Sequence, residues 1–191
     1  MKRINISLIA CMFFCSSIAL VSCSKGTKAP DTVENAEERN DSVAPTSEAK
    51  DDAEFLVKAA HGSMLEVELA KVAQARALSA DVKKYGSVLQ EQHSKMLTDI
   101  KAVAAKRNVA VPESLNQDGL DKVKKFQEKP TNEFDKDYIK CMVDDHETDI
   151  KDFQEEAQSG SNEEVRKLAT DALPHLQAHL TEAKKWKEMM K

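Results

Sequence analysis

From Asp51 onward, apolar residues recur every three or four positions along four long stretches of the chain. An α-helix has 3.6 residues per turn, so this spacing gathers the apolar residues on one face of each helix. Gly and Pro number only five each, which is too few for the many turns of a β-rich domain. The pattern predicts an all-α domain over residues 51–191, with helices at 52–78, 79–107, 131–160 and 161–187.

Capping and breaking residues indicate where these helices begin. Ser79 is expected to cap the second helix and Thr131 the third, since a hydroxyl can accept a hydrogen bond from a free backbone N–H of the first turn. Ser161 and Glu164 have the Ser-x-x-Glu spacing of a capping box at the start of the fourth helix. Pro174 lies inside the fourth helix and predicts a kink or a break there.

The connection between the second and third helices is long. Residues 108–131 contain Pro112 and one short amphipathic stretch near 120–126, for which we expect a short helix. The chain is therefore predicted to form one helical hairpin, a long crossover and a second hairpin. That connectivity is typical of a ferritin-like four-helix bundle.

The first 22 residues differ from the rest of the chain. Lys2 and Arg3 precede an almost wholly apolar run at 8–21. This is the pattern of a secretory signal peptide, and it is too short for a stable membrane-spanning helix. We expect residues 1–22 to be removed from the mature protein.

The signal ends in Leu20-Val21-Ser22-Cys23, which is typical of a bacterial lipobox. Cys23 is then the lipidated N-terminus that anchors the protein to a membrane. Ser24, rather than an aspartate, follows it, as in lipoproteins of the outer membrane. The predicted location is the cell envelope, on the outer membrane and facing the periplasm. The alternative is an ordinary cleaved signal with an incidental cysteine.

Composition limits the partners of the mature chain. Two of the 28 basic residues fall in the signal, so the mature chain carries 26 basic and 33 acidic residues. No basic cluster is dense enough for nucleic acid binding, while an envelope protein partner and a homo-oligomer are left open. Residues 23–50 are polar and are expected to be a lipidated, disordered tether. Cys141 is the one other mature cysteine, so an internal disulfide is excluded.

Two of the five histidines lie within apolar stripes. His93 and His146 each have apolar residues three or four positions away on both sides, so both should point into the bundle. Residues at equal distance from the turn of an antiparallel hairpin lie at the same height. Glu66 pairs with His93 in this way, and His146 pairs with His175. His179 is one turn beyond His175, about 6 Å along the axis.

Imidazoles and a carboxylate at one height suggest a metal site. The candidate ligands are Glu66, His93, His146, His175 and His179. This donor set suits Zn²⁺, Cu²⁺ or Fe. Carboxylates near the ligands could orient an imidazole by hydrogen bonding, and the candidates for that role are Glu68, Asp145 and Asp149. The alternative is a structural polar layer in which these side chains only bond to one another.

From about residue 55 to 183 the chain resembles a bacterial family of unknown function, often called predicted outer membrane proteins and assigned to the ferritin-like superfamily. The residues that carry the resemblance are Ala59-Ala60, Met64-x-Glu66-Val67-Glu68-Leu69, His93, Tyr138, Met142-Val143-x-Asp145-His146, Phe153 to Ala157 and Leu173-Pro174-x-Leu176-x-x-His179-Leu180. The resemblance implies the ferritin-like fold and an exported or lipid-anchored protein, and it implies no established activity. It favours His179 over His175, whereas the height argument favours His175.

The Glu-x-x-His motif of ferritin-like di-iron sites is absent. Gln90 and Val143 stand three residues before His93 and His146, so ferroxidase chemistry is not expected. The leading interpretation is an envelope lipoprotein that binds a metal. The alternatives are a metal-free structural or interaction lipoprotein, and a redox or hydrolytic enzyme with an open metal position.

Overall fold

The computed structural model describes residues 32–43 and 46–190. Within these ranges all regular elements are α-helices, which confirms the all-α prediction. They are α1 (Thr32–Val43), α2 (Ser47–Arg76), α3 (Ala80–Lys106), α4 (Gln117–Glu128), α5 (Thr131–Ser159) and α6 (Glu163–Met189). None of these helices is long and apolar enough to cross a membrane. The predicted signal peptide and Cys23 lie outside the described residues.

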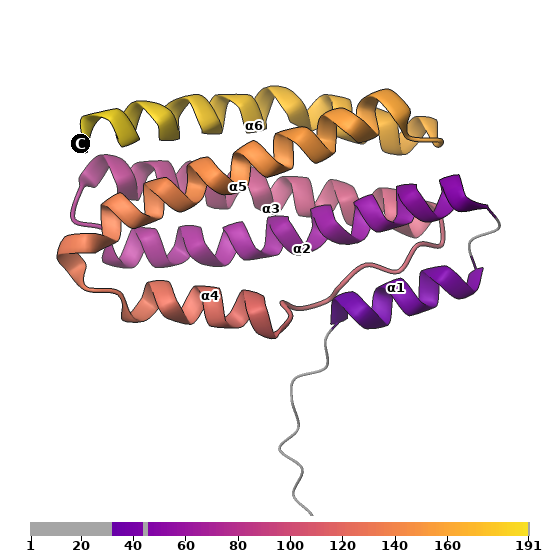
Figure 1. Cartoon of the computed structure of the whole chain (residues 1–191), viewed down its shortest axis with the longest axis horizontal. Helices are drawn as coiled ribbons and strands as arrows, with labels where there is room; N and C mark the ends of the chain where they lie inside the picture. The colour runs from indigo at the N-terminus through magenta and orange to yellow at the C-terminus, as the bar shows by residue number, and fades with distance from the viewer. Residues whose placement is uncertain (1–31, 44–45, 191) are drawn as a thin grey trace, which may run out of the picture.

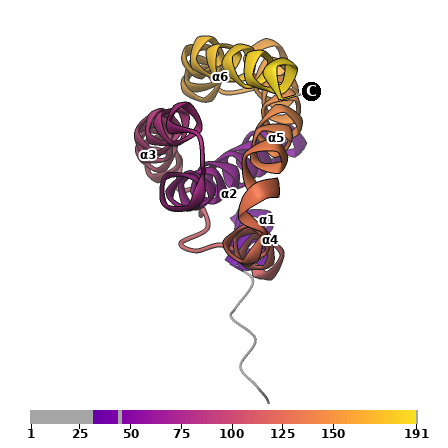
Figure 2. The same ribbon diagram turned by 90° about the vertical axis from the view of Figure 1, so that its left-hand side faces the viewer.

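The four longest helices form two antiparallel hairpins that pack against each other. α2 packs along α3 and α5 along α6, while α2 also contacts α5 and α3 contacts α6 (Figures 1 and 2). A close approach of α2 and α3 occurs at Gly86, where a Cβ atom would stand 3.1 Å from the Ala70 carbonyl oxygen. The absence of a side chain there lets the two backbones lie together.

The crossover returns the chain along the length of the molecule, so that α3 and α5 run in the same direction (Figure 1). It includes α4, which confirms the short helix predicted near residues 120–126. α4 and α1 lie one after the other along the same side of α2 (Figures 1 and 2). The hairpin, crossover, hairpin order therefore matches the sequence pattern.

The apolar core consists of two clusters, one toward each end of the long helices. One contains Leu89 and Met142, and the other contains Met96 and Phe153. His93 lies between Leu89 and Met96 on α3, and His146 lies between Met142 and Phe153 on α5. His93 and His146 thus lie in a polar layer between two hydrophobic regions.

The N-terminal part differs from the predicted disordered tether, because α1 and the first turn of α2 lie within residues 23–50. Ala36 and Asn40 of α1 are buried. The Asn40 amide donates to the Ala110 carbonyl at 2.9 Å and accepts from the Ala110 N–H at 2.7 Å. α1 has few apolar residues, so the apolar spacing of the sequence did not predict this helix. A hydrogen-bonded contact with the distant crossover holds α1 in place.

Two predicted caps and the predicted break need correction. Ser79 caps α3 as expected, accepting from the N–H of Asp81 at 3.2 Å. Pro130 precedes α5 without a side-chain cap, so Thr131 is its first residue and not its cap. Asn162 caps α6, and the capping box at Ser161 and Glu164 is wrong. Ser161 instead bonds to Asp52 of α2 through both its N–H and its hydroxyl, at 2.8 and 2.6 Å.

Pro174 leaves α6 as one helix. The helix extends over both sides of it, from Glu163 to Met189. A proline removes one N–H from the helical hydrogen bonds, and the packing of α6 along α5 is sufficient to keep the helix continuous.

Candidate metal centre

Glu66, His93, His146 and His179 meet in the polar layer, one from each of the four long helices. Their exposed fractions are 2%, 1%, 0% and 3%. Each occupies a core-facing position that an apolar side chain would otherwise fill. A buried polar side chain costs free energy unless it has a partner, so the arrangement needs a chemical explanation.

The three imidazole rings form a nearly equilateral triangle. Their centroids lie 5.5 Å apart for His93 and His146, 5.3 Å for His93 and His179, and 5.2 Å for His146 and His179. One nitrogen from each ring can be chosen so that all three lie within 4.8 Å of one another. Three donors this close can bind one ion after small side-chain rotations.

The tautomer of His146 follows from its backbone contact. Its Nδ1 lies 2.9 Å from the Met142 carbonyl oxygen. A carbonyl has no proton to give, so Nδ1 carries the proton and donates. In the neutral ring, Nε2 is then unprotonated, and its lone pair faces the centre of the layer.

His179 presents a second nitrogen at the same place. Its Nδ1 lies 3.1 Å from His146 Nε2, and its Nε2 lies 2.8 Å from Gln92 Oε1. With the amide in this orientation, Nε2 donates to Gln92 and Nδ1 is unprotonated. Two lone pairs then face each other across 3.1 Å, which requires a cation or a proton between them. Metal-binding histidines commonly donate their outer N–H in this way.

Glu66 and His93 are in close, buried contact. His93 Nε2 lies 2.8 Å from Glu66 Oε2, and His146 Nδ1 lies 3.4 Å from Glu66 Oε1. Neither contact has the geometry of a well-aligned hydrogen bond, so Glu66 and His93 are joined chiefly as a buried ion pair. Buried polar atoms without a well-aligned hydrogen bond are rare and call for a specific cause.

The charges of the layer favour one ion pair. Burial would raise the pKa of Glu66, but the nearby imidazoles, His93 first and then His146, outweigh it and lower that pKa to about 2. Burial would lower the pKa of His93, but the Glu66 carboxylate outweighs it and raises that pKa. Glu66 is therefore ionised, and the charged form of His93 is favoured beside it.

The other two histidines are held neutral. Burial, which disfavours the charged form, lowers the pKa of His146 despite the nearby Glu66 carboxylate. Burial, and then the neighbouring His93 and His146 rings, lower the pKa of His179 to about 3. A neutral imidazole is the form that binds a metal, so two of the three rings are ready to bind at neutral pH.

Several predicted site residues lie outside this cluster. His175 is exposed on α6, so the height argument that favoured it is wrong. Glu68 is partly exposed and pairs with Lys71 at 2.7 Å. Asp145 pairs with Lys122 at 2.8 Å and bonds to no histidine ring in the described part of the chain. Glu68 and Asp145 thus each have a lysine partner, and the His175 side chain is exposed at the surface.

Asp149 lies near the layer without bonding to it. It is half-buried on α5, one turn beyond His146. Burial and the Glu66 carboxylate raise its pKa to about 8. The predicted role of orienting an imidazole has no hydrogen bond to support it.

Sequence reasoning missed the groups that fix the two neutral rings. Gln92 bonds to the His179 ring, and Tyr85 donates its hydroxyl to the His179 carbonyl at 3.1 Å. The Met142 carbonyl fixes the His146 ring. A backbone carbonyl has no signature in the sequence. Gln92 could have been found only by knowing that α6 packs beside α3.

The comparisons with known proteins identify the family. The family described as "Domain of unknown function (DUF4142)" matches residues 37–186. The chain belongs to this family. The matched part of this DUF4142 chain includes all four residues of the layer. No curated protein matches the chain.

A solved structure has a similar fold. It is described as the crystal structure of a DUF305 fragment from Deinococcus radiodurans, with a TM-score of 0.64 and 11% sequence identity. The match covers 73% of this chain and 96% of the other. At that identity the similarity concerns the helical fold alone.

Proposed function

We propose that this protein is an envelope lipoprotein whose helical domain binds one transition-metal ion through His93, His146 and His179. Glu66 supplies a negative charge and a fourth donor. The observation that carries the proposal is the pair of inward-facing nitrogens of His146 and His179, 3.1 Å apart, with their outer nitrogens at Met142 and Gln92. Two nitrogens bound to one Zn²⁺ at 2.0–2.1 Å are separated by about 3.3 Å in tetrahedral geometry.

The donor set indicates the class of metal. Imidazole nitrogens suit Zn²⁺, Cu²⁺ and Fe²⁺, whereas Ca²⁺ and Mg²⁺ prefer oxygen. The negative charge of Glu66 offsets part of the charge of a divalent ion in a buried place. All four side chains are almost wholly buried, so substrate has no open position at the ion. The geometry therefore supports holding a metal rather than catalysis at it.

The connectivity of the helices supports a ferritin-like four-helix bundle made of α2, α3, α5 and α6. Such bundles place metal ligands on facing helices in their core, where these four residues lie. The missing Glu-x-x-His motif separates this centre from a di-iron site. A single ion bound mainly by imidazoles is the corresponding proposal.

The test is the metal content of the full chain, purified without a polyhistidine tag and analysed by elemental analysis. About one ion of Zn, Cu or Fe per chain is expected, and it should remain after dialysis. A metal-free protein that is not stabilised by added Zn²⁺, Cu²⁺ or Fe²⁺ would refute the proposal. The polar layer would then be structural, and an interaction lipoprotein with a metal-free bundle would replace the proposed function.

The membrane anchor has its own test. We propose that Cys23 carries lipid and holds the domain at the outer membrane, facing the periplasm. Cys23→Ser removes the thiol that accepts the lipid, so the protein should move from the membrane fraction to the soluble fraction of the envelope. Fractionation with immunoblotting measures this, with Cys141→Ser as the control that keeps the anchor. A Cys23→Ser protein that stays in the membrane fraction would show that the lipobox interpretation is wrong.

A further inference from the structure

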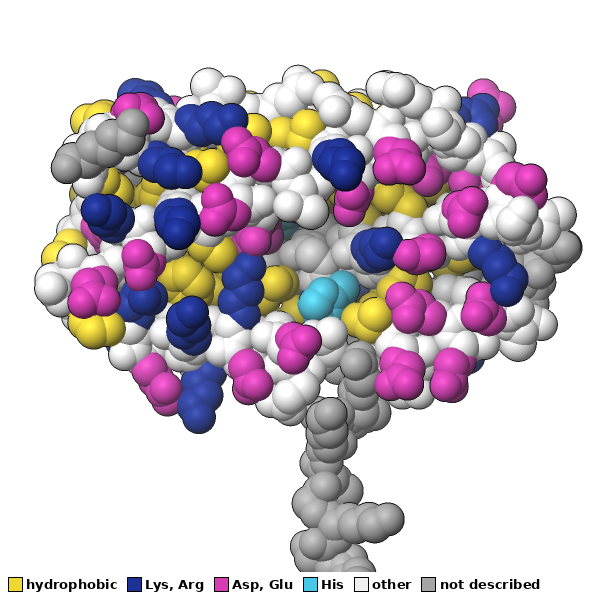
Figure 3. All heavy atoms as spheres, viewed as in Figure 1, with side chains coloured by type: hydrophobic (Ala, Val, Ile, Leu, Met, Phe, Trp, Pro, Cys, Tyr) yellow, Lys and Arg dark blue, Asp and Glu magenta, His cyan; other side chains and the backbone are white. Residues whose placement is uncertain are grey.

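A groove of about 310 Å³ runs between α2 and α5 near the α5–α6 turn. Eight of its fifteen lining residues are acidic, and Lys58 is the one basic residue among them. Lys58 is already paired with Glu54 at 2.6 Å. Acidic side chains also gather over this end of the molecule on the face shown in Figure 3. The groove therefore has a strong excess of negative charge.

The described carboxylates of this groove do not form a ready chelating site. Within the described part of the chain, the one group of three or more possible ligands close enough for one ion is the histidine cluster. Asp52 is occupied by the backbone and hydroxyl of the α5–α6 turn. Asp152 and Glu155 have no such partner among the residues that the structure describes. The carboxylates can thus concentrate cations without holding one tightly, as a charged cleft does for an incoming ion.

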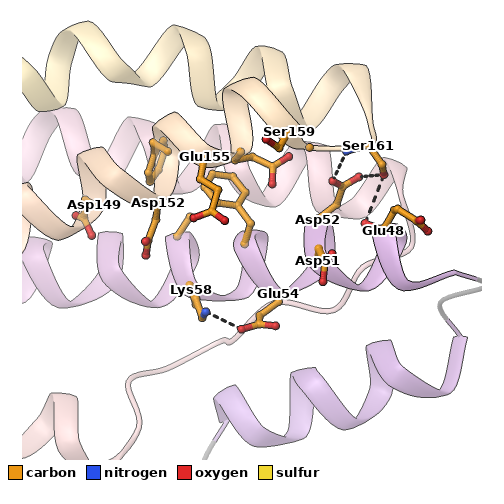
Figure 4. A pocket seen from close by; sticks show the side chains of 15 residues that line it. Glu48, Asp51, Asp52, Glu54, Lys58, Asp149, Asp152, Glu155, Ser159 and Ser161 are labelled. Carbon is orange, nitrogen blue, oxygen red and sulfur yellow. Dashed lines mark hydrogen bonds and ion pairs between the residues drawn. The ribbon is translucent and has the colours of Figure 1, made fainter.

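The inner end of the groove lies next to the metal centre. Asp149 and Asp152 both point from α5 toward α2 (Figure 4). A Cβ atom at Gly62 would stand 3.9 Å from Asp149 Oδ1, so Asp149 lies over Gly62, which is one turn of α2 from Glu66. Asp149 is also one turn of α5 from His146, about 4.5 Å along the axis.

A second observation points to a cation beyond this inner end. His93, His146 and His179 are buried and close enough to one another to hold one ion. Since Asp149 lies over Gly62, one turn of α2 from Glu66, negative charge continues from the groove lining to the Glu66 carboxylate of the layer.

We infer that the acidic groove between α2 and α5 is the route by which a divalent metal cation reaches the His93, His146 and His179 centre. The inference rests on the proposed function, since it concerns loading of the same site. Carboxylates at the mouth raise the local concentration of cations, and Asp149 is the last carboxylate before the layer. The groove thus determines how fast the site fills.

The test measures the rate at which Co²⁺ loads into the metal-free full chain, using the visible absorption of Co²⁺ in stopped-flow mixing. The groove variant is Asp152→Asn with Glu155→Gln. The control variant, Glu128→Gln with Asp171→Asn, removes the same charge from α4 and α6. Both control residues are in exposed pairs with lysine, which contribute little to stability.

At an ionic strength of about 0.01 M, where the Debye length is about 30 Å, the groove variant should load at least about threefold more slowly than the unmodified chain. The control variant should change much less. At about 1 M salt, where the Debye length is about 3 Å, the rates of the groove variant and the unmodified chain should converge. A groove variant that loads as fast as the unmodified chain at low salt, or a control that slows equally, would overturn the inference.

The two proposals fail in different ways. If the unmodified chain binds none of the ions Co²⁺, Zn²⁺ and Cu²⁺, the metal site itself is refuted. The loading route is then refuted with it. If the unmodified chain binds Co²⁺ but the groove variant shows no slower loading, the metal site stands and the groove has no part in filling it. Circular dichroism of both variants verifies that their helices are intact.

Discussion

A chain with His93→Ala and His146→Ala is expected to lose stoichiometric metal binding. The two substitutions remove two of the three imidazoles and leave His179 with Glu66. Changes in groups that only orient ligands cost about 10–100-fold in metal affinity, and the loss of two ligands should cost more. Calorimetric titration with Zn²⁺ or Cu²⁺ and elemental analysis after dialysis measure the effect.

His175→Ala is the matched control for this experiment. His175 lies on the same helix as His179 and one turn from it, but it is exposed. We expect this variant to bind one ion with unchanged affinity. Unchanged affinity in the double variant, or an equal loss in His175→Ala, would show that the ion binds elsewhere.

Glu66→Ala is expected to lower the free energy of unfolding of the metal-free protein by about 3–5 kcal/mol, because it removes one partner of a buried charge pair. The Glu66 side chain is 2% exposed and its Oε2 lies 2.8 Å from His93 Nε2. Its loss leaves the His93 ring beside a cavity in the core. Urea unfolding followed by circular dichroism measures the change.

The size of this effect should depend on pH in a defined way. The folded pKa of Glu66 is lowered from 4.5 to about 2, so its contribution is present above pH 4.5 and is lost as the pH falls toward 2. The folded pKa of His93 is raised from 6.5, so its contribution is present below pH 6.5 and is lost as the pH rises through the folded value. The difference in stability should therefore be largest between about pH 4.5 and 6.5.

Glu68→Ala provides the control on the same helix. Glu68 is two residues away and forms an exposed pair with Lys71, so the change in stability should stay within about 0.5 kcal/mol. If Glu66→Ala is no more destabilising than Glu68→Ala across this pH range, the ion pair contributes nothing and Glu66 is not held charged in the fold.

The helices and much of the polar layer could be predicted because they depend on spacing within one hairpin. Apolar residues at helical spacing placed His93 and His146 in the core, and both are buried. The symmetry of a hairpin about its turn brought Glu66 to the height of His93, and their atoms are 2.8 Å apart. Both arguments use distances within one hairpin, where the helix geometry fixes the answer.

The choice between His175 and His179 needed the position of α6. The buried residues of this helix include Ala172, Leu176, His179 and Ala183, spaced by four, three and four residues. His175 falls outside that stripe. The height argument failed because it fixed the level along the axis and ignored the direction in which the side chain points.

By itself, the sequence determined the all-α class and the two hairpins with their crossover, and it placed Glu66, His93 and His146 in the buried polar layer. Helical periodicity and the symmetry of a hairpin about its turn determine these features, because both follow from helix geometry within one hairpin. Only the tertiary structure decided that His179 joins the layer, that Gln92 and the Met142 carbonyl fix the rings, and that Asn40 holds α1 against the crossover. Those contacts join residues far apart in the chain or backbone groups common to every residue, so no local pattern reveals them.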